Sequence, residues 1–125
     1  MKKVSILIPA YNEEEVLYTL YDRLENVINK LNNYEFEVLL INDGSKDNTL
    51  NILRELRKRD KRMCYINLSR NYGKETAMIA GLDYVTGDCC IILDADLQDP
   101  PELIEEMLKY WEQGYDDVYA KRKSR

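Results

Sequence analysis

The sequence predicts an α/β domain with a mostly parallel sheet and helices on both of its faces. Short apolar runs of strand length alternate with longer segments in which apolar residues recur at helical spacing. Strands that alternate with helices imply crossover connections, which make neighbouring strands parallel and cover the sheet with helices. A length of 125 residues suits one domain with a single core, and we find no internal repeat or linker.

The first half of the chain predicts two strand–helix units. The run VSILI (4–8) is β-branched and apolar, which is typical of a buried strand. Apolar residues recur at helical spacing from Glu14 onward, so a helix is expected there. The run FEVLLI (36–41) predicts the second strand. The turn residues NDGSKDN follow it, and Asp47 or Asn48 is placed to cap the next helix.

The second half predicts three further strands and two helices. MCYINL (63–68) reads as a strand, and GKETAMIAGLDYV (73–85) as a helix rich in small residues. CCIIL (89–93) is expected to be a buried central strand. PPELIEEMLKYWEQG (100–114) predicts a helix with proline in its first turn, because proline there loses no helical hydrogen bond. DDVYA (116–120) predicts a short fifth strand.

Composition excludes several classes of function. The net charge of −5 argues against a nucleic-acid partner, because such proteins usually present a basic face. Histidine is absent, which removes Ser-His-Asp and Cys-His catalysis and most zinc sites. The three cysteines, Cys64, Cys89 and Cys90, form no CxxC pair and are expected to be packed thiols in a reducing compartment. The N-terminal apolar run is too short for a signal peptide and nothing reaches the length of a membrane span, so a cytoplasmic location is expected.

Polar clusters follow every predicted strand. They are PAYNEEE, NDGSKDN, SRNYGK, DADLQD and KRKSR, in chain order. The carboxyl ends of parallel strands meet at one edge of a sheet, and ligands of such sheets bind beyond that edge. One shared binding site is therefore expected.

The cluster DADLQD predicts a cation site. Residues two apart in an extended chain share a face, so Asp94, Asp96 and Gln98 present oxygen atoms to one side. Two close carboxylates repel unless a cation lies between them, and oxygen ligands suit Mg²⁺ or Mn²⁺. Asp99 is better interpreted as a cap of the helix that follows.

The clusters after the first two strands each allow two interpretations. Asp43 lies where a carboxylate binds a ribose hydroxyl or a base N–H group, but NDGS also fits a plain turn with Gly44 at positive φ. Tyr11 offers a ring against which a base packs. The glutamates that begin at Glu13 are equally explained by the helix dipole alone.

The basic residues after the third and fifth strands are candidates for a phosphate site. Arg70 and Lys74 flank a glycine at a helix start, where backbone N–H groups also favour an anion. The alternative is that both are ordinary surface charges. Arg122 just beyond the fifth strand is likewise placed for a phosphate, or belongs to a charged tail. Neither a P-loop nor a G-x-G-x-x-G motif is present.

Taken together, five segments resemble the family 2 glycosyltransferases, which have the GT-A fold. They are SILIPAYNEEEVL, INDGSKDNT, LSRNYGKETAMIAGL, DADLQDPPELI and GYDDVYAKRKSR, and they cover essentially the whole chain. The polyprenyl-phosphate branch, with its dolichol-phosphate mannosyltransferases and bactoprenol glucosyltransferase-like proteins, is the most similar. The resemblance implies a GT-A, Rossmann-like fold that binds a nucleotide sugar.

The resemblance also assigns roles to single residues. With the two basic candidates above, the expected donor-binding residues are Pro9, Tyr11, Glu13, Ile41, Asp43, Asp94, Ala95, Arg70, Lys74 and Arg122. Asp94 and Asp96 are the expected catalytic residues, and they hold Mg²⁺ or Mn²⁺ together with Gln98. The sequence departs from many relatives at Asn42, where a second acid is common; the amide keeps hydrogen bonding and drops one charge.

The implied reaction is a metal-dependent, inverting transfer of a sugar from a nucleoside diphosphate sugar to a lipid-linked phosphate at the cytoplasmic face of a membrane. A hydroxyl acceptor in polysaccharide or glycan synthesis, and a donor-binding fragment without turnover, are the alternatives. Residues 1–125 are expected to be the nucleotide-sugar-binding part of a longer protein, truncated at the C-terminus; the oligomeric state stays open. A receiver-type signalling domain is excluded, because its phosphoacceptor aspartate is missing after the third strand.

Overall fold

The computed structural model describes residues 1–97 and 100–114. Strands and helices alternate along the chain as β1 (Lys2–Ala10), α1 (Leu17–Lys30), β2 (Tyr34–Asn42), α2 (Thr49–Arg59), β3 (Met63–Asn67), α3 (Lys74–Leu82), β4 (Cys89–Ile92) and α4 (Leu103–Glu112). The predicted order of these elements is therefore confirmed. The predicted strand at 116–120 lies outside the described residues.

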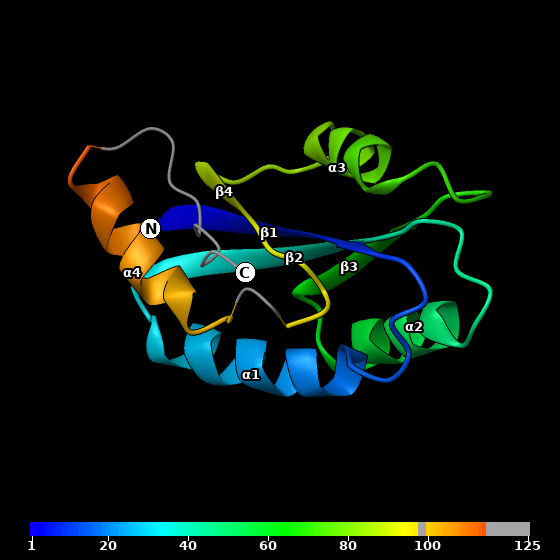
Figure 1. The fold of residues 1–125 in the computed structure, drawn as a ribbon. Coiled ribbons are helices and arrows are strands. Elements are labelled where there is room, and N and C mark those ends of the chain that lie inside the picture. The colour runs from blue at the N-terminus through cyan, green and yellow to red at the C-terminus, as the bar shows by residue number, and fades with distance from the viewer. Residues whose placement is uncertain (98–99, 115–125) are drawn as a thin grey trace, which may run out of the picture.

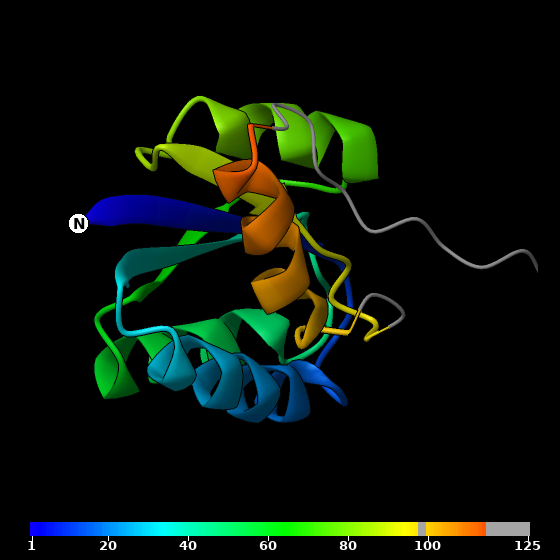
Figure 2. The same ribbon diagram turned by 90° about the vertical axis from the view of Figure 1, so that its left-hand side faces the viewer.

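The described strands form one parallel sheet in the order β3-β2-β1-β4. From β1 the chain adds β2 and then β3 on one side of the sheet, and it then crosses back so that β4 pairs with the other side of β1. Because crossovers between parallel strands are right-handed, this reversal of direction puts the connecting helices on opposite faces. Figures 1 and 2 show α1 and α2 on one face and α3 on the other. The expected parallel sheet with helices on both faces is thus confirmed.

The alternation of side chains along β1 divides the core between the two faces. Val4, Ile6 and Ile8 point toward α1, α2 and α4 and belong to the larger apolar cluster. Leu7 points toward α3 and belongs to a smaller cluster with Ala77. α3 covers its face of the sheet alone among the described helices, so this second cluster is small.

Of the two predicted caps of α2, Asp47 makes the bond: its Oδ1 accepts from the Thr49 N–H at 2.9 Å, and the Asn48 side chain makes no capping bond. Other details differ from the sequence-based expectations. α1 begins at Leu17 instead of Glu14, because the residues before it form a turn. α3 ends at Leu82 instead of residue 85. α4 begins at Leu103, so the two prolines lie in the turn before it.

A further difference concerns β4, which is an edge strand among the described residues and not a central one. Its cysteines are only partly buried, one toward each face of the sheet. Burial raises the pKa of Cys89 to about 11, so this thiol stays protonated at neutral pH.

None of the described helices has the length and apolar character that crossing a bilayer requires.

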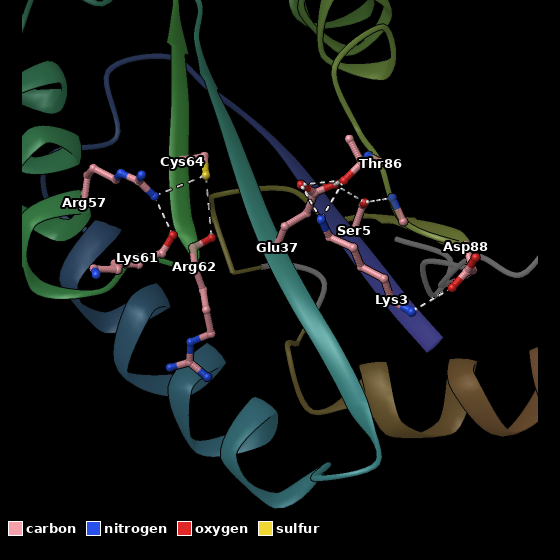
Figure 3. A network of polar contacts seen from close by, with 10 residues as sticks. Lys3, Ser5, Glu37, Arg57, Lys61, Arg62, Cys64, Thr86 and Asp88 are labelled. Carbon is pink, nitrogen blue, oxygen red and sulfur yellow. Dashed lines mark hydrogen bonds and ion pairs between the residues drawn. The ribbon is translucent and has the colours of Figure 1, made fainter. Parts of the chain in front are cut away.

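A polar network ties the loop before β4 to the amino-terminal half of the sheet (Figure 3). Glu37 on β2 accepts hydrogen bonds from the hydroxyl of Ser5 on β1 and, at 2.6 Å, from the N–H of Thr86. The Lys3 ammonium lies 3.6 Å from the same carboxylate. Burial acts to raise the pKa of Glu37, but these hydrogen bonds and Lys3 outweigh it, so the pKa lies below its ordinary value of 4.5.

We expect Glu37→Gln to lower the free energy of unfolding at pH 7. A carboxylate whose pKa is depressed in the folded state contributes stability above its unfolded pKa, and that stability is lost as the pH falls through the folded pKa. The difference between variant and parent should therefore shrink below about pH 4.5. Urea unfolding from pH 7 to acid measures this. Glu35→Gln, at an exposed position of the same strand, is the control; equal losses in both variants would contradict the network's role.

Close packing of α3 on the sheet generates a second prediction. A Cβ atom at Gly81 would lie 2.4 Å from Leu7 Cδ1 and 2.9 Å from Ile41 Cδ1, and both of these side chains are fully buried. Gly81→Ala should therefore destabilise the fold by about 1 kcal/mol net, since overpacking exceeds the helix propensity that alanine adds. Thr76→Ala, at an exposed position of α3, should be neutral or slightly stabilising in the same urea titration. A stabilised Gly81→Ala variant would show that α3 does not pack this closely.

Candidate functional site

A cavity of about 400 Å³ opens at the carboxyl ends of the strands. It lies where the strand order reverses at β1, the position at which open α/β sheets bind ligands. Loops that follow all four described strands contribute to its wall, which consists of Pro9, Ala10, Tyr11, Glu13, Asp43, Asn71, Gly73, Lys74, Asp94, Ala95 and Asp96. The polar clusters that the structure describes therefore meet at one cavity, and its role as a shared binding site stays a prediction.

The loops after β1 and β2 are fastened to each other at the rim of this cavity. Asn12, which has a positive φ of 52°, donates its N–H to Ser45 Oγ at 2.9 Å and accepts from the Lys46 N–H at 2.8 Å. The N–H of Glu13 donates to Thr49 Oγ1 at 2.9 Å. These bonds position the loop after β1, in which Tyr11 and Glu13 line the cavity.

Asp43 joins the end of β2 to the loop after β3. Its carboxylate is buried and accepts from the N–H of Tyr72 at 2.8 Å and the N–H of Gly73 at 3.0 Å. The Asn71 side-chain amide donates to the same carboxylate at 3.2 Å. Asp43 therefore shapes one wall of the cavity, a role that the sequence did not indicate. The carboxylate has about four lone-pair positions and three are used here, so it keeps acceptor capacity toward the cavity.

Gly44 permits the close approach of these two loops. It has a positive φ of 67°, as the turn motif predicted. A Cβ atom at this position would lie 2.2 Å from the carbonyl carbon of Arg70 and the backbone nitrogen of Asn71. Glycine is thus required both by the turn and by the backbone that passes over it.

Asn42, the departure from the family pattern, lies outside the cavity. Its side chain is buried and donates from Nδ2 to Asn67 Oδ1 on the neighbouring strand β3 at 2.8 Å. The Asn42 Oδ1 atom accepts from the Ser45 N–H at 3.3 Å. The Asn42 side chain thus joins β2 to β3 and supports the turn after β2, and it does not line the cavity.

Carboxylates concentrate at the floor of the cavity. Asp94, which is only 8% exposed, follows β4 and forms an ion pair with the ammonium of Lys74 at the start of α3. Asp96 and Glu13 lie nearby. Burial and then the carboxylates of Asp96 and Asp47 raise the pKa of Glu13 above its ordinary value. Among the described lining residues, the carboxylates therefore outnumber the single cation, Lys74.

The donor set fits a hard divalent cation in part. No cluster of three or more acidic or cysteine side chains within residues 1–97 and 100–114 has the geometry of a metal site. Asp94 and Asp96 nevertheless present two carboxylates to one cavity, and oxygen ligands of this kind suit Mg²⁺ or Mn²⁺. Because Mg²⁺ sites commonly combine one or two carboxylates with phosphate oxygens and water, these two residues are compatible with a metal that arrives with a phosphorylated ligand.

Some residues expected to bind a ligand lie elsewhere. Ile41 is fully buried in the smaller apolar cluster beneath α3, so its side chain does not line the cavity. Arg70 also lies outside the lining, with its guanidinium carbon 4.9 Å from the centre of the Tyr72 ring. Gln98 and Arg122 lie outside the described residues, as does the predicted cap Asp99. Their roles stay predictions.

Three lining residues were not among the expected set: Ala10, Asn71 and Gly73. Gly73 has a φ of 100°, and a glycine immediately before a predicted helix was an available signal for such a turn. Asn71 is recognisable only through its bond to Asp43, which joins loops far apart in the sequence.

Comparison with known sequences identifies close relatives. Residues 5–125 match the sequence model of Glycosyl transferase family 2. An uncharacterized glycosyltransferase of Synechocystis is 50% identical over 98% of this chain and 38% of the relative. A prophage bactoprenol glucosyl transferase homolog of Escherichia coli is 43% identical over 98% of this chain and 40% of the relative. The chain thus spans about two-fifths of the length of these curated relatives.

Solved structures share the fold. Staphylococcus aureus TarS (residues 1–349) superposes with a TM-score of 0.73 at 24% identity, over 89% of this chain and 32% of that one. A mannosyltransferase from Pyrobaculum calidifontis, in complex with GDP-Man and Mn²⁺, superposes with a TM-score of 0.72 at 21% identity, over 87% of this chain and 32% of that one. Both are glycosyltransferases of the expected GT-A type, so the predicted fold is confirmed.

We expect Asp43→Ala to loosen the wall of the cavity. The variant removes the acceptor of the Tyr72 and Gly73 N–H groups, and an unsatisfied buried donor costs about 1–3 kcal/mol. Urea unfolding measures this loss. Hydrogen–deuterium exchange should show faster exchange at these two amides. Asp83→Ala, which removes an exposed carboxylate at the end of α3, is the control; unchanged exchange at Tyr72 and Gly73 in the Asp43 variant would contradict this role.

Proposed function

Since this chain belongs to Glycosyl transferase family 2, we propose that it forms the donor-binding part of an enzyme that moves a sugar from a nucleoside diphosphate sugar to a polyprenyl phosphate, with inversion at the anomeric carbon. The observation that carries the proposal is the placement of Asp94 and Asp96 in a cavity at the strand-order reversal. Relatives named bactoprenol glucosyl transferase support a polyprenyl acceptor.

The donor nucleotide is held at the β1 and β2 side of the cavity. The Tyr11 ring is 41% exposed and lines the cavity, so it offers a face against which a base packs. Asp43 lies in the same wall. Its carboxylate has lone pairs that the protein does not use, and these can accept a hydrogen bond from a ribose hydroxyl or a base N–H group. Neighbours of the same fold were solved with UDP-GlcNAc and with GDP-Man, so both bases are candidates for this chain.

The diphosphate occupies the acidic floor, where it requires a cation. Asp94 and Asp96 hold Mg²⁺ or Mn²⁺, and we assign Gln98 as a further ligand from the sequence motif. The metal, when bound, neutralises charge on the departing diphosphate.

A polyprenyl phosphate reacts in this site without a dedicated general base. The second pKa of a phosphomonoester is about 6, so the acceptor is already largely ionised at neutral pH. Such an acceptor is carried by a lipid, which places the reaction at a membrane surface. We place the acceptor-binding residues in the part of the whole protein that this chain does not include, since the relatives are longer.

The direct test is calorimetric titration of the chain with UDP-glucose and GDP-mannose, with and without Mn²⁺. We expect one of them to bind in a metal-dependent manner. Asp96→Asn should weaken that binding by about tenfold or more, roughly 1.4 kcal/mol, and should remove its metal dependence while the circular dichroism spectrum stays unchanged.

Asp83→Asn, the same change at an exposed position just after α3, is the matched control and should leave the titration unchanged. Absence of metal-dependent binding to either nucleotide sugar would contradict the proposal. In the full-length protein, transfer to a sugar hydroxyl but not to a polyprenyl phosphate would overturn the acceptor assignment alone.

A further inference from the structure

The Lys74 side chain places its ammonium group at the floor of the cavity. It is the first residue of α3, and its ammonium pairs with Asp94 Oδ1. The carboxylate side chain is 11% exposed, whereas the lysine side chain is 54% exposed. The Asp94 carboxylate is therefore held in place by its surroundings, whereas the Lys74 ammonium reaches it from the surface.

This ion pair conflicts with metal binding at the same carboxylate. An ammonium and a divalent cation repel each other at contact distance. A metal that takes Asp94 as a ligand therefore favours displacement of the Lys74 ammonium. Among the described residues that line the cavity, Lys74 is the single lysine or arginine, so an anionic ligand that enters the cavity meets this ammonium.

We propose that Lys74 is an exchangeable counter-ion: it neutralises Asp94 in the free protein, yields that carboxylate to the metal, and then pairs with the donor phosphates. The proposal rests on the proposed function for the identity of the anion. The half-exposed side chain permits the exchange, because a lysine stem is flexible and its head lies in the open cavity. The buried carboxylate never loses a cationic partner during the exchange, which avoids the cost of an unpaired buried charge.

The exchange predicts two effects of opposite sign when the ammonium is removed. Metal alone should bind more tightly, because its competitor for Asp94 is gone. Nucleotide in the presence of metal should bind more weakly, because the phosphates lose a cationic partner. A merely structural ion pair, which fastens α3 to the end of β4, would not produce this division.

The experiment compares Lys74→Met with the parent chain in two titrations. Electron paramagnetic resonance of Mn²⁺ without nucleotide should show about three- to tenfold tighter binding in the variant, the range expected for a pair with one buried and one half-exposed partner. Calorimetric titration with UDP or GDP at saturating Mn²⁺ should show about three- to tenfold weaker binding. Lys74→Arg keeps the positive charge and should stay near the parent in the first titration.

Lys58→Met, at an exposed position of α2, is the control for loss of a surface lysine and should change neither titration. Unchanged or weaker Mn²⁺ binding in Lys74→Met, or no Mn²⁺ binding to it at all, would overturn the exchange. If Lys74→Met fails to fold by circular dichroism, Lys74→Gln replaces it with the same expectations. The first titration contains no nucleotide, so a failure of the proposed function, seen as no nucleotide binding to the parent, is distinguished from a failure of this inference.

Discussion

The site depends on the pairing of β1 with parallel strands on both of its sides. β2 follows β1 directly along the chain, whereas β4 reaches the other side of β1 only after β3 and α3 have been placed. This return forces the helices onto opposite faces, and the cavity lies at the carboxyl ends of the strands, the position at which such sheets bind ligands. The residues that follow β1 and β4 line that cavity, as do those from the loops beyond β2 and β3.

Charge gives this cavity its chemical character. The chain is acidic overall, and the cavity lining carries four carboxylates against one described cation. Burial, and after it the carboxylates of Asp96 and Asp47, raise the pKa of Glu13. A metal at Asp94 and Asp96, as proposed, would reduce the repulsion between these carboxylates and the diphosphate of the proposed donor.

Neighbouring residues of one motif have different structural roles, which the sequence alone did not distinguish. Asn42 and Asp43 are adjacent at the end of β2, yet the first pairs with Asn67 between strands and the second holds the loop that carries Gly73. Both tasks depend on partners from β3 and the loop after it. In the same way, the apolar run of β4 indicated a buried strand, but the sheet order makes it an edge strand among the described residues.

The sequence by itself determined the order of strands and helices, the clustering of polar residues at the strand ends and the family of the chain, since these follow from local periodicity, turn residues and motifs. It also predicted most of the acidic lining, including Asp94 and Asp96. Only the tertiary structure decided that Ile41 lies in the core, that Asp43 holds a loop, and that Lys74 pairs with Asp94. The physical reason is that these contacts join segments far apart in the chain, and their partners are set by strand order and crossover direction, which no local pattern encodes.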